Sequence, residues 1–152
     1  MKTIVRRSAF TLIEVLIVVV IMAILAATII PQFTDSTKDA KTSTVKFNLA
    51  TLRSQVQLYR TQHNGTNPSA TLVELASATD VSGAIGSGPT FVFGPYLREV
   101  PTNPFTNSKT VKVITNDPAQ AGDVSSGSGG GWLYNVTTGN VWIDGADPLY
   151  KY

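Results

Sequence analysis

The sequence predicts an α+β fold: a long N-terminal α-helix, serving as membrane anchor and amphipathic stem, packs on a small antiparallel β-sheet head. Three observations predict this fold. Residues 10–30 are almost uniformly apolar, and residues 45–59 place apolar side chains at helical spacing. Two short β-prone segments near residues 132–144 flank a turn.

The apolar segment of residues 10–30 is long enough to cross a membrane, since about 20 apolar residues suffice for a spanning helix. Lys2, Arg6 and Arg7 precede it, which predicts a cytoplasmic N-terminus and an extracytoplasmic remainder. A cleaved secretory signal has a shorter apolar region, and a lipoprotein needs a cysteine that the chain lacks. A simple signal anchor leaves Glu14 unexplained, because an ionisable group inside a membrane span is costly and usually functional.

The stem follows as an amphipathic helix. One apolar stripe comprises Val45, Leu49, Leu52, Val56 and Tyr59. The helix should end near His63-Asn64-Gly65, because glycine commonly follows the last helical turn. Pro31 predicts a kink or local melting where the apolar segment ends, since proline removes a backbone donor.

The head is small enough to form one domain. Its predicted elements are a short helix over 70–76, a strand over 110–115 and a hairpin whose strands, 132–136 and 140–144, flank the turn at 137–139. We expect this sheet to pack on the apolar stripe of the stem.

The segment Ala9-Phe10-Thr11-Leu12-Ile13-Glu14 resembles the type III signal of type IV pilins and pseudopilins, a family of membrane-anchored filament subunits. The resemblance implies a pilin-like fold. It also implies that a prepilin peptidase cuts between Ala9 and Phe10 and N-methylates Phe10. The family usually has glycine before the cut, where this chain has Ala9, which is also small.

This resemblance divides the chain into four parts. Residues 1–9 would be a leader removed on maturation, and residues 10–31 the transmembrane and filament-core helix. Residues 32–64 would form the amphipathic stem, and residues 65–152 the small globular head with its C-terminal β-hairpin.

The cut would change the charge of the chain and the surroundings of Glu14. Losing Lys2, Arg6 and Arg7 lowers the formal charge by three, from +2 to −1, so the basic balance gives no support for nucleic-acid binding. The new amine on Phe10 needs a counter-charge in an apolar filament core, since an unpaired buried ion costs several kcal/mol. We expect Glu14 of a neighbouring subunit to supply it; the alternative is a pair between Phe10 and Glu14 within one helix.

Two head segments resemble major pseudopilins of type II secretion systems: the proline-rich loop Gly94 to Phe105, and Gly131-Trp132-Leu133-Tyr134-Asn135 with Thr138-Gly139. The absence of cysteine excludes the disulfide found in many type IV pilins.

The resemblance implies a structural subunit of a type II secretion pseudopilus. This helical homopolymer would form a periplasmic filament that drives protein export, with minor pseudopilins and an inner-membrane assembly platform as partners. One alternative is a type IV pilin, major or minor, for adhesion, motility or DNA uptake. Another is a membrane-anchored ligand-binding protein.

Major pseudopilins commonly bind calcium in a C-terminal acidic loop, and the candidate ligands here are Asp123, Asp144 and Asp147. Calcium prefers six to eight oxygen ligands, whereas residues 144–147 supply only two carboxylates. The alternative is that these aspartates are solvated turn residues. No other cofactor is expected.

The sequence gives little support for catalysis. The single histidine, His63, lies at the predicted end of the stem, and no nucleophile or metal-ligand motif occurs, so we expect no enzyme activity.

Charges are segregated along the chain, with a formal charge of +3 over residues 32–63 and −3 over residues 64–152. This predicts either contacts between basic stems and acidic heads of neighbouring subunits, or two merely solvated faces.

Overall fold

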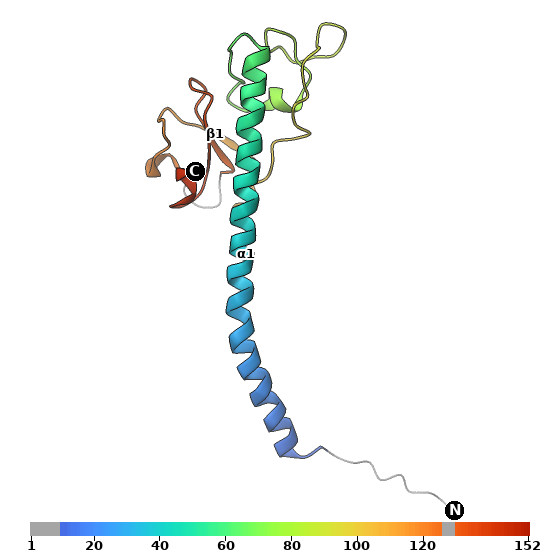
Figure 1. Ribbon diagram of the computed structural model, residues 1–152, viewed down its shortest axis with the longest axis vertical. Coiled ribbons are helices and arrows are strands. Elements are labelled where there is room, and N and C mark those ends of the chain that lie inside the picture. Colours follow the sequence, from blue (N-terminus) through green and yellow to red (C-terminus); the bar gives the residue numbers. More distant parts are fainter. Residues whose placement is uncertain (1–9, 126–129) are drawn as a thin grey trace, which may run out of the picture. The chain divides into compact units, whose positions relative to one another are not determined.

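The computed structural model describes residues 10–125 and 130–152, so the predicted leader, including Ala9, lies outside the described residues. The chain divides into two compact units, Met1–Ala40 and Lys41–Tyr152, and each is described by itself. One helix, α1 (Leu12–Gln62), contributes to both units (Figure 1). The four-part division based on the resemblance stays a prediction. α1 continues through position 31, so the predicted local melting at Pro31 is wrong, and the kink stays a prediction.

The C-terminal end of α1 follows the predicted glycine signal. Asn64 and Gly65 have positive φ angles of 52° and 84°, the left-handed conformation that ends many helices. The Gly65 N–H donates to the Arg60 carbonyl at 2.8 Å, which satisfies one of the orphan carbonyls of the last turn. The chain therefore leaves the helix within two residues of Gln62.

The predicted apolar stripe is the core of the unit Lys41–Tyr152. Val45, Leu52 and Val56 are fully buried, and Leu49 and Tyr59 nearly so. They pack against side chains of the sheet and of the segment before it, namely Leu72, Leu75, Trp132, Tyr134, Val141 and Ile143. The head thus covers one face of α1, as predicted.

The sheet has three short strands in the order β1 (Val111–Val113), β2 (Trp132–Tyr134) and β3 (Val141–Ile143). β2 and β3 are antiparallel, which confirms the predicted hairpin. β1 pairs parallel to β2, so the sheet is mixed and not wholly antiparallel. The long connection over residues 114–131 allows this pairing, because a parallel neighbour needs a crossover of about a dozen residues or more.

Both faces of the sheet are covered. Trp132 and Tyr134 face α1, whereas Leu133 and Trp142 pack with Ile114 and Ala119 on the opposite face. Three short 3-10 helices complete the unit: η1 (Val73–Ala76), η2 (Ala121–Asp123) and η3 (Leu149–Lys151). The predicted helix over 70–76 is therefore a shorter 3-10 turn, and the α+β class is confirmed.

Candidate functional site

The N-terminus of α1 is closed by a reciprocal pair of side chains, Thr11 and Glu14. The Thr11 backbone N–H donates to Glu14 Oε2 at 2.8 Å, and the Thr11 hydroxyl donates to the same oxygen at 2.7 Å. In return, the Glu14 N–H donates to Thr11 Oγ1 at 3.3 Å. This is a capping box, in which two backbone donors without helical partners are satisfied by two side chains.

The capping box adds a residue that the sequence reasoning missed. The signal for it was available, because Thr-x-x-Glu immediately before an apolar helix is a known helix start. The structure gives Glu14 a partner in its own chain, Thr11. The sequence analysis considered only the Phe10 amine, of a neighbouring subunit or of the same helix. The predicted pairing of Glu14 with a Phe10 amine stays a prediction.

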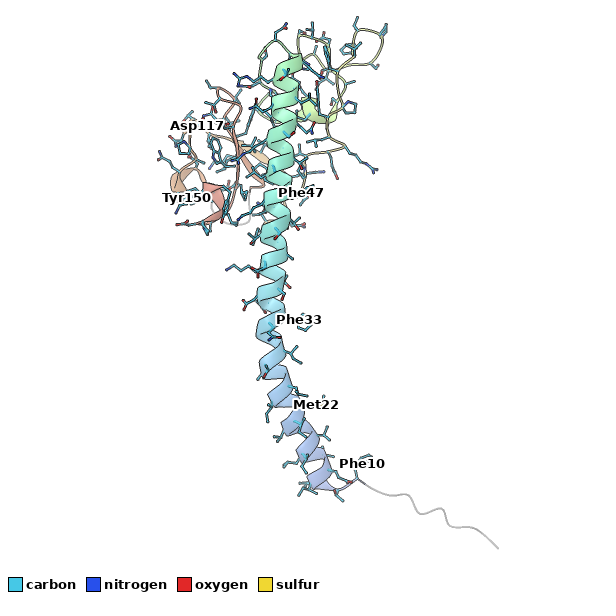
Figure 2. The ribbon with its side chains drawn as sticks, in the orientation of Figure 1. Phe10, Met22, Phe33, Phe47, Asp117 and Tyr150 are labelled. Atoms are coloured by element: carbon cyan, nitrogen blue, oxygen red, sulfur yellow. The ribbon has the colours of Figure 1, made fainter. Side chains whose placement is uncertain are left out.

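The N-terminal part of α1 leaves its apolar side chains uncovered. Every valine, isoleucine, leucine and methionine between Leu12 and Ile30 is exposed. Figure 2 labels Met22 on this segment and Phe10 just before it. Among the described residues, α1 is the one helix long and apolar enough to cross a membrane, by length and composition. An exposed apolar surface of this size marks a membrane or protein contact.

A second candidate site surrounds Asp144 in the head. Asp144 is only 2% exposed, and its Oδ1 accepts the Ser125 N–H at 2.8 Å. Its Oδ2 has no hydrogen-bond partner among the described residues, and neither has the buried Thr106 Oγ1. Both residues line a cavity of about 320 Å³. A Cβ at Gly130 would overlap Asp144 Oδ2, so a larger residue there would displace this carboxylate.

The other two predicted calcium ligands are engaged elsewhere. Asp123 accepts the Asn116 side-chain amide at 3.0 Å and the Gln120 N–H at 2.8 Å. Asp147 forms an exposed ion pair with Lys151 at 2.7 Å. Within residues 10–125 and 130–152, no three His, Cys, Asp or Glu side chains are placed to hold a metal ion.

The donor set at Asp144 is therefore too small for calcium by itself. The unpaired oxygens of Asp144 and Thr106 fall short of the six to eight that calcium prefers. The three aspartates together do not fit the ion as one site in the part of the chain that the structure describes.

Several charges that were candidates for contacts between subunits are used within the chain. Arg53 donates to the carbonyls of Val141 and Tyr152, each at 2.9 Å. The ammonium group of Lys46 lies 3.7 Å from the ring centroid of Tyr152. On the head, Glu99 pairs with Lys109 at 2.9 Å. The contacts of Arg53 and Lys46 tie the C-terminal residues to α1.

His63 has a structural environment. Its ring is 1% exposed and stacks on Tyr59 with centroids 3.7 Å apart. Nδ1 lies 2.8 Å from the Tyr59 carbonyl, and Nε2 lies 3.0 Å from the Thr79 hydroxyl. Both ring nitrogens are thus engaged by neutral groups at the end of α1.

Comparisons with known proteins agree with the sequence motif. Residues 4–30 match the family described as the prokaryotic N-terminal methylation motif. The chain is also 36% identical over 55 residues to type II secretion system core protein G of Pseudomonas aeruginosa. That alignment covers 36% of this chain and 39% of the relative, so the chain spans well under half of the length of that protein. No solved structure matches the chain. The two matches confirm the resemblance to pilin-like proteins close to core protein G.

Proposed function

We propose that this pilin-like chain is a structural subunit of a type II secretion pseudopilus. The similarity to core protein G carries the proposal, and the methylation motif over residues 4–30 supports it. The subunit assembles through its N-terminal helix into a periplasmic filament that drives protein export. It acts as a structural element and not as an enzyme.

Maturation begins at the inner membrane, where the chain is anchored once, with its N-terminus cytoplasmic and its head periplasmic. A prepilin peptidase cuts between Ala9 and Phe10 and methylates the new amine on Phe10. That amine lies one residue before Thr11, whose N–H and hydroxyl already hold Glu14 Oε2. The carboxylate is therefore oriented at the helix start before a second subunit arrives.

Assembly then gives Glu14 a second partner. In the single chain its Oε2 accepts two hydrogen bonds from Thr11. In the filament it pairs with the cationic Phe10 amine of a neighbouring subunit, because that amine would otherwise be buried without a counter-charge. The exposed apolar side chains of α1 leave the lipid and pack on those of neighbouring subunits. Minor pseudopilins and the inner-membrane assembly platform are the further partners.

Calcium has no part in this proposal, because the described residues around Asp144 supply too few oxygen ligands for the ion. The other two aspartates, Asp123 and Asp147, are engaged by protein groups.

The test compares Glu14→Ala with the control Glu99→Ala in a secretion-competent host that lacks its own major pseudopilin. Glu99 is an exposed acid whose ion pair with Lys109 lies on the head surface. We expect both variants to be cut after Ala9, as mass spectrometry of the purified chain would show. Only Glu14→Ala should lose filaments and secretion, since Glu99 takes no part in the proposed pair.

Two results would contradict the proposal. Normal filaments and secretion from Glu14→Ala would remove the assembly role of Glu14. Failure of the unaltered chain to restore secretion, with long surface fibres formed instead, would assign it to the type IV pilins that act in adhesion, motility or DNA uptake.

A further inference from the structure

The cavity beside the end of β3 contains two buried oxygen atoms that the proposed function does not use. They are Asp144 Oδ2 and Thr106 Oγ1, and neither has a hydrogen-bond partner among the described residues. Asp144 as a whole is only 2% exposed, and both residues line the same cavity of about 320 Å³. Folded proteins leave few buried polar atoms unpaired, so two of them in one cavity point to a ligand.

The two oxygen atoms are held in place by a buried asparagine, Asn103. Its Nδ2 donates to the carbonyls of Gly131 and Asp144, at 3.1 and 3.3 Å. Its Oδ1 accepts the Phe105 N–H at 2.9 Å. Because Thr106 follows Phe105 directly, this one side chain joins the loop that carries Thr106 to the end of β3. The site is therefore preorganised, which lowers the cost of binding a ligand.

The charge of Asp144 indicates the sign of that ligand. Among the described residues, its carboxylate accepts one hydrogen bond, from the Ser125 N–H to Oδ1 at 2.8 Å. The ion pairs found in the same part of the head, such as Lys151 with Asp147, do not include Asp144. A buried carboxylate without a counter-charge is costly, and a water molecule would supply a hydrogen bond but no charge. The ligand that fits is therefore a cation.

The number of free oxygen atoms and the walls of the cavity select the class of cation. Calcium prefers six to eight oxygen ligands. A guanidinium group binds a carboxylate best through both oxygens, and Oδ1 is already occupied by the Ser125 N–H. A primary ammonium group presents three separate N–H donors and needs only one carboxylate oxygen. The apolar side chains of Phe105, Val124 and Leu149 also line the cavity, and they suit an alkyl chain.

We propose that this cavity binds a primary alkylammonium group. Its N–H groups donate to Asp144 Oδ2 and Thr106 Oγ1, and its alkyl chain packs on the apolar wall. A lysine side chain of another protein and a free alkylamine share this chemistry. The bound ammonium gives the buried carboxylate its counter-charge and links the loop of Thr106 to the end of β3, so binding stabilises the head.

Matched small molecules test this chemistry through the melting temperature of the head. The purified full chain is heated in detergent at pH 7 and constant ionic strength, and tryptophan fluorescence follows the buried Trp132 and Trp142. n-Butylammonium at about ten times its Kd should raise Tm by about 5 °C. 1-Butanol has the alkyl chain without the charge, and butyltrimethylammonium has the charge without N–H donors. Neither of these two should raise Tm.

Three variants assign the response to the cavity. Asp144→Asn keeps an acceptor for the Ser125 N–H but carries no charge, so it should lose the shift in Tm. Thr106→Val keeps the shape of the side chain without its hydroxyl, and it should bind n-butylammonium at least about tenfold more weakly. The control Asp147→Asn removes an exposed acid that pairs with Lys151, and it should respond like the natural chain.

A second ligand distinguishes the two sources of the ammonium group. Stabilisation by Nα-acetyl-lysine N-methylamide as well as by n-butylammonium would assign the site to a lysine of a partner protein, whereas stabilisation by n-butylammonium alone would assign it to a free alkylamine. The absence of a shift with n-butylammonium, or an equal shift in Asp144→Asn, would overturn the proposal. Because the purified chain is tested without secretion machinery, these results are independent of the test of function.

Discussion

The packing of the head on α1 can be tested with two leucines of the same helix. Leu52 is fully buried in the core between stem and sheet, whereas Leu58, less than two turns later on α1, is 44% exposed. The substitutions Leu52→Ala and Leu58→Ala remove the same atoms from the same type of secondary structure. Their difference therefore reports burial alone.

The magnitude for Leu52→Ala follows from its complete burial. Three lost carbon atoms at about 0.8 kcal/mol each give roughly 2.4 kcal/mol of transfer free energy. The cavity that remains adds to this, so we expect a loss of about 3 kcal/mol in the free energy of unfolding. For a unit of this size, roughly 4 °C per kcal/mol gives a fall in Tm of about 12 °C. Leu58→Ala should cost less than about 1 kcal/mol.

The assay follows tryptophan fluorescence of the full chain in detergent during heating. Both tryptophans of the chain, Trp132 and Trp142, are buried in the sheet, so their emission reports the head and not the anchor. Equal shifts in Tm for the two variants would refute the reasoning, because the head would then not depend on the buried stripe.

Two further predictions concern buried oxygen atoms of the head. Burial raises the pKa of the Tyr134 hydroxyl, which donates to the Pro68 carbonyl at 2.9 Å. Because the pKa is raised in the folded state, the contribution of the neutral Tyr134 hydroxyl to the free energy of unfolding is fully present below about pH 10, where unfolded tyrosine titrates. The free energy of unfolding should decline at higher pH, and Tyr134→Phe should weaken that decline in unfolding curves measured between pH 8 and pH 12. If the substitution left the pH dependence unchanged, Tyr134 would not be the group responsible. At Asp144, replacing the carboxylate by Asn leaves the acceptor for the Ser125 N–H and removes an unpaired buried charge. Asp144→Asn should therefore match or exceed the natural chain in Tm, both in EDTA and with added calcium. A Tm below that of the natural chain would show that the carboxylate is stabilised by its surroundings.

Periodicity in the sequence predicted the elements that form by local rules. The three-and-four spacing from Val45 to Tyr59 placed the buried face of α1. The turn between the two aromatic segments placed the antiparallel hairpin. The end of α1 followed from Asn64 and Gly65, because their left-handed conformation is a property of those residues.

The remaining features depend on residues that are distant in the sequence. The direction of β1 is set by the path of a long connection, which no local pattern encodes. Arg53 looked like a free stem charge until the structure placed Tyr152 beside it. Asp123 and Asp144 looked equivalent as acidic residues. Asp123 is held by an asparagine and a backbone amide, whereas Asp144 is buried with one oxygen that has no partner among the described residues.

The capping box at Thr11 also sets the N-terminal limit of α1. Phe10 and Thr11 lie outside α1, which begins at Leu12. A protease must bind its substrate as extended backbone, so a helix that continued through residue 10 would conceal the bond after Ala9. By closing the helix at Thr11, the capping box places the proposed cleavage point before the first residue of α1, and the bonds of the capping box itself join only Thr11 and Glu14.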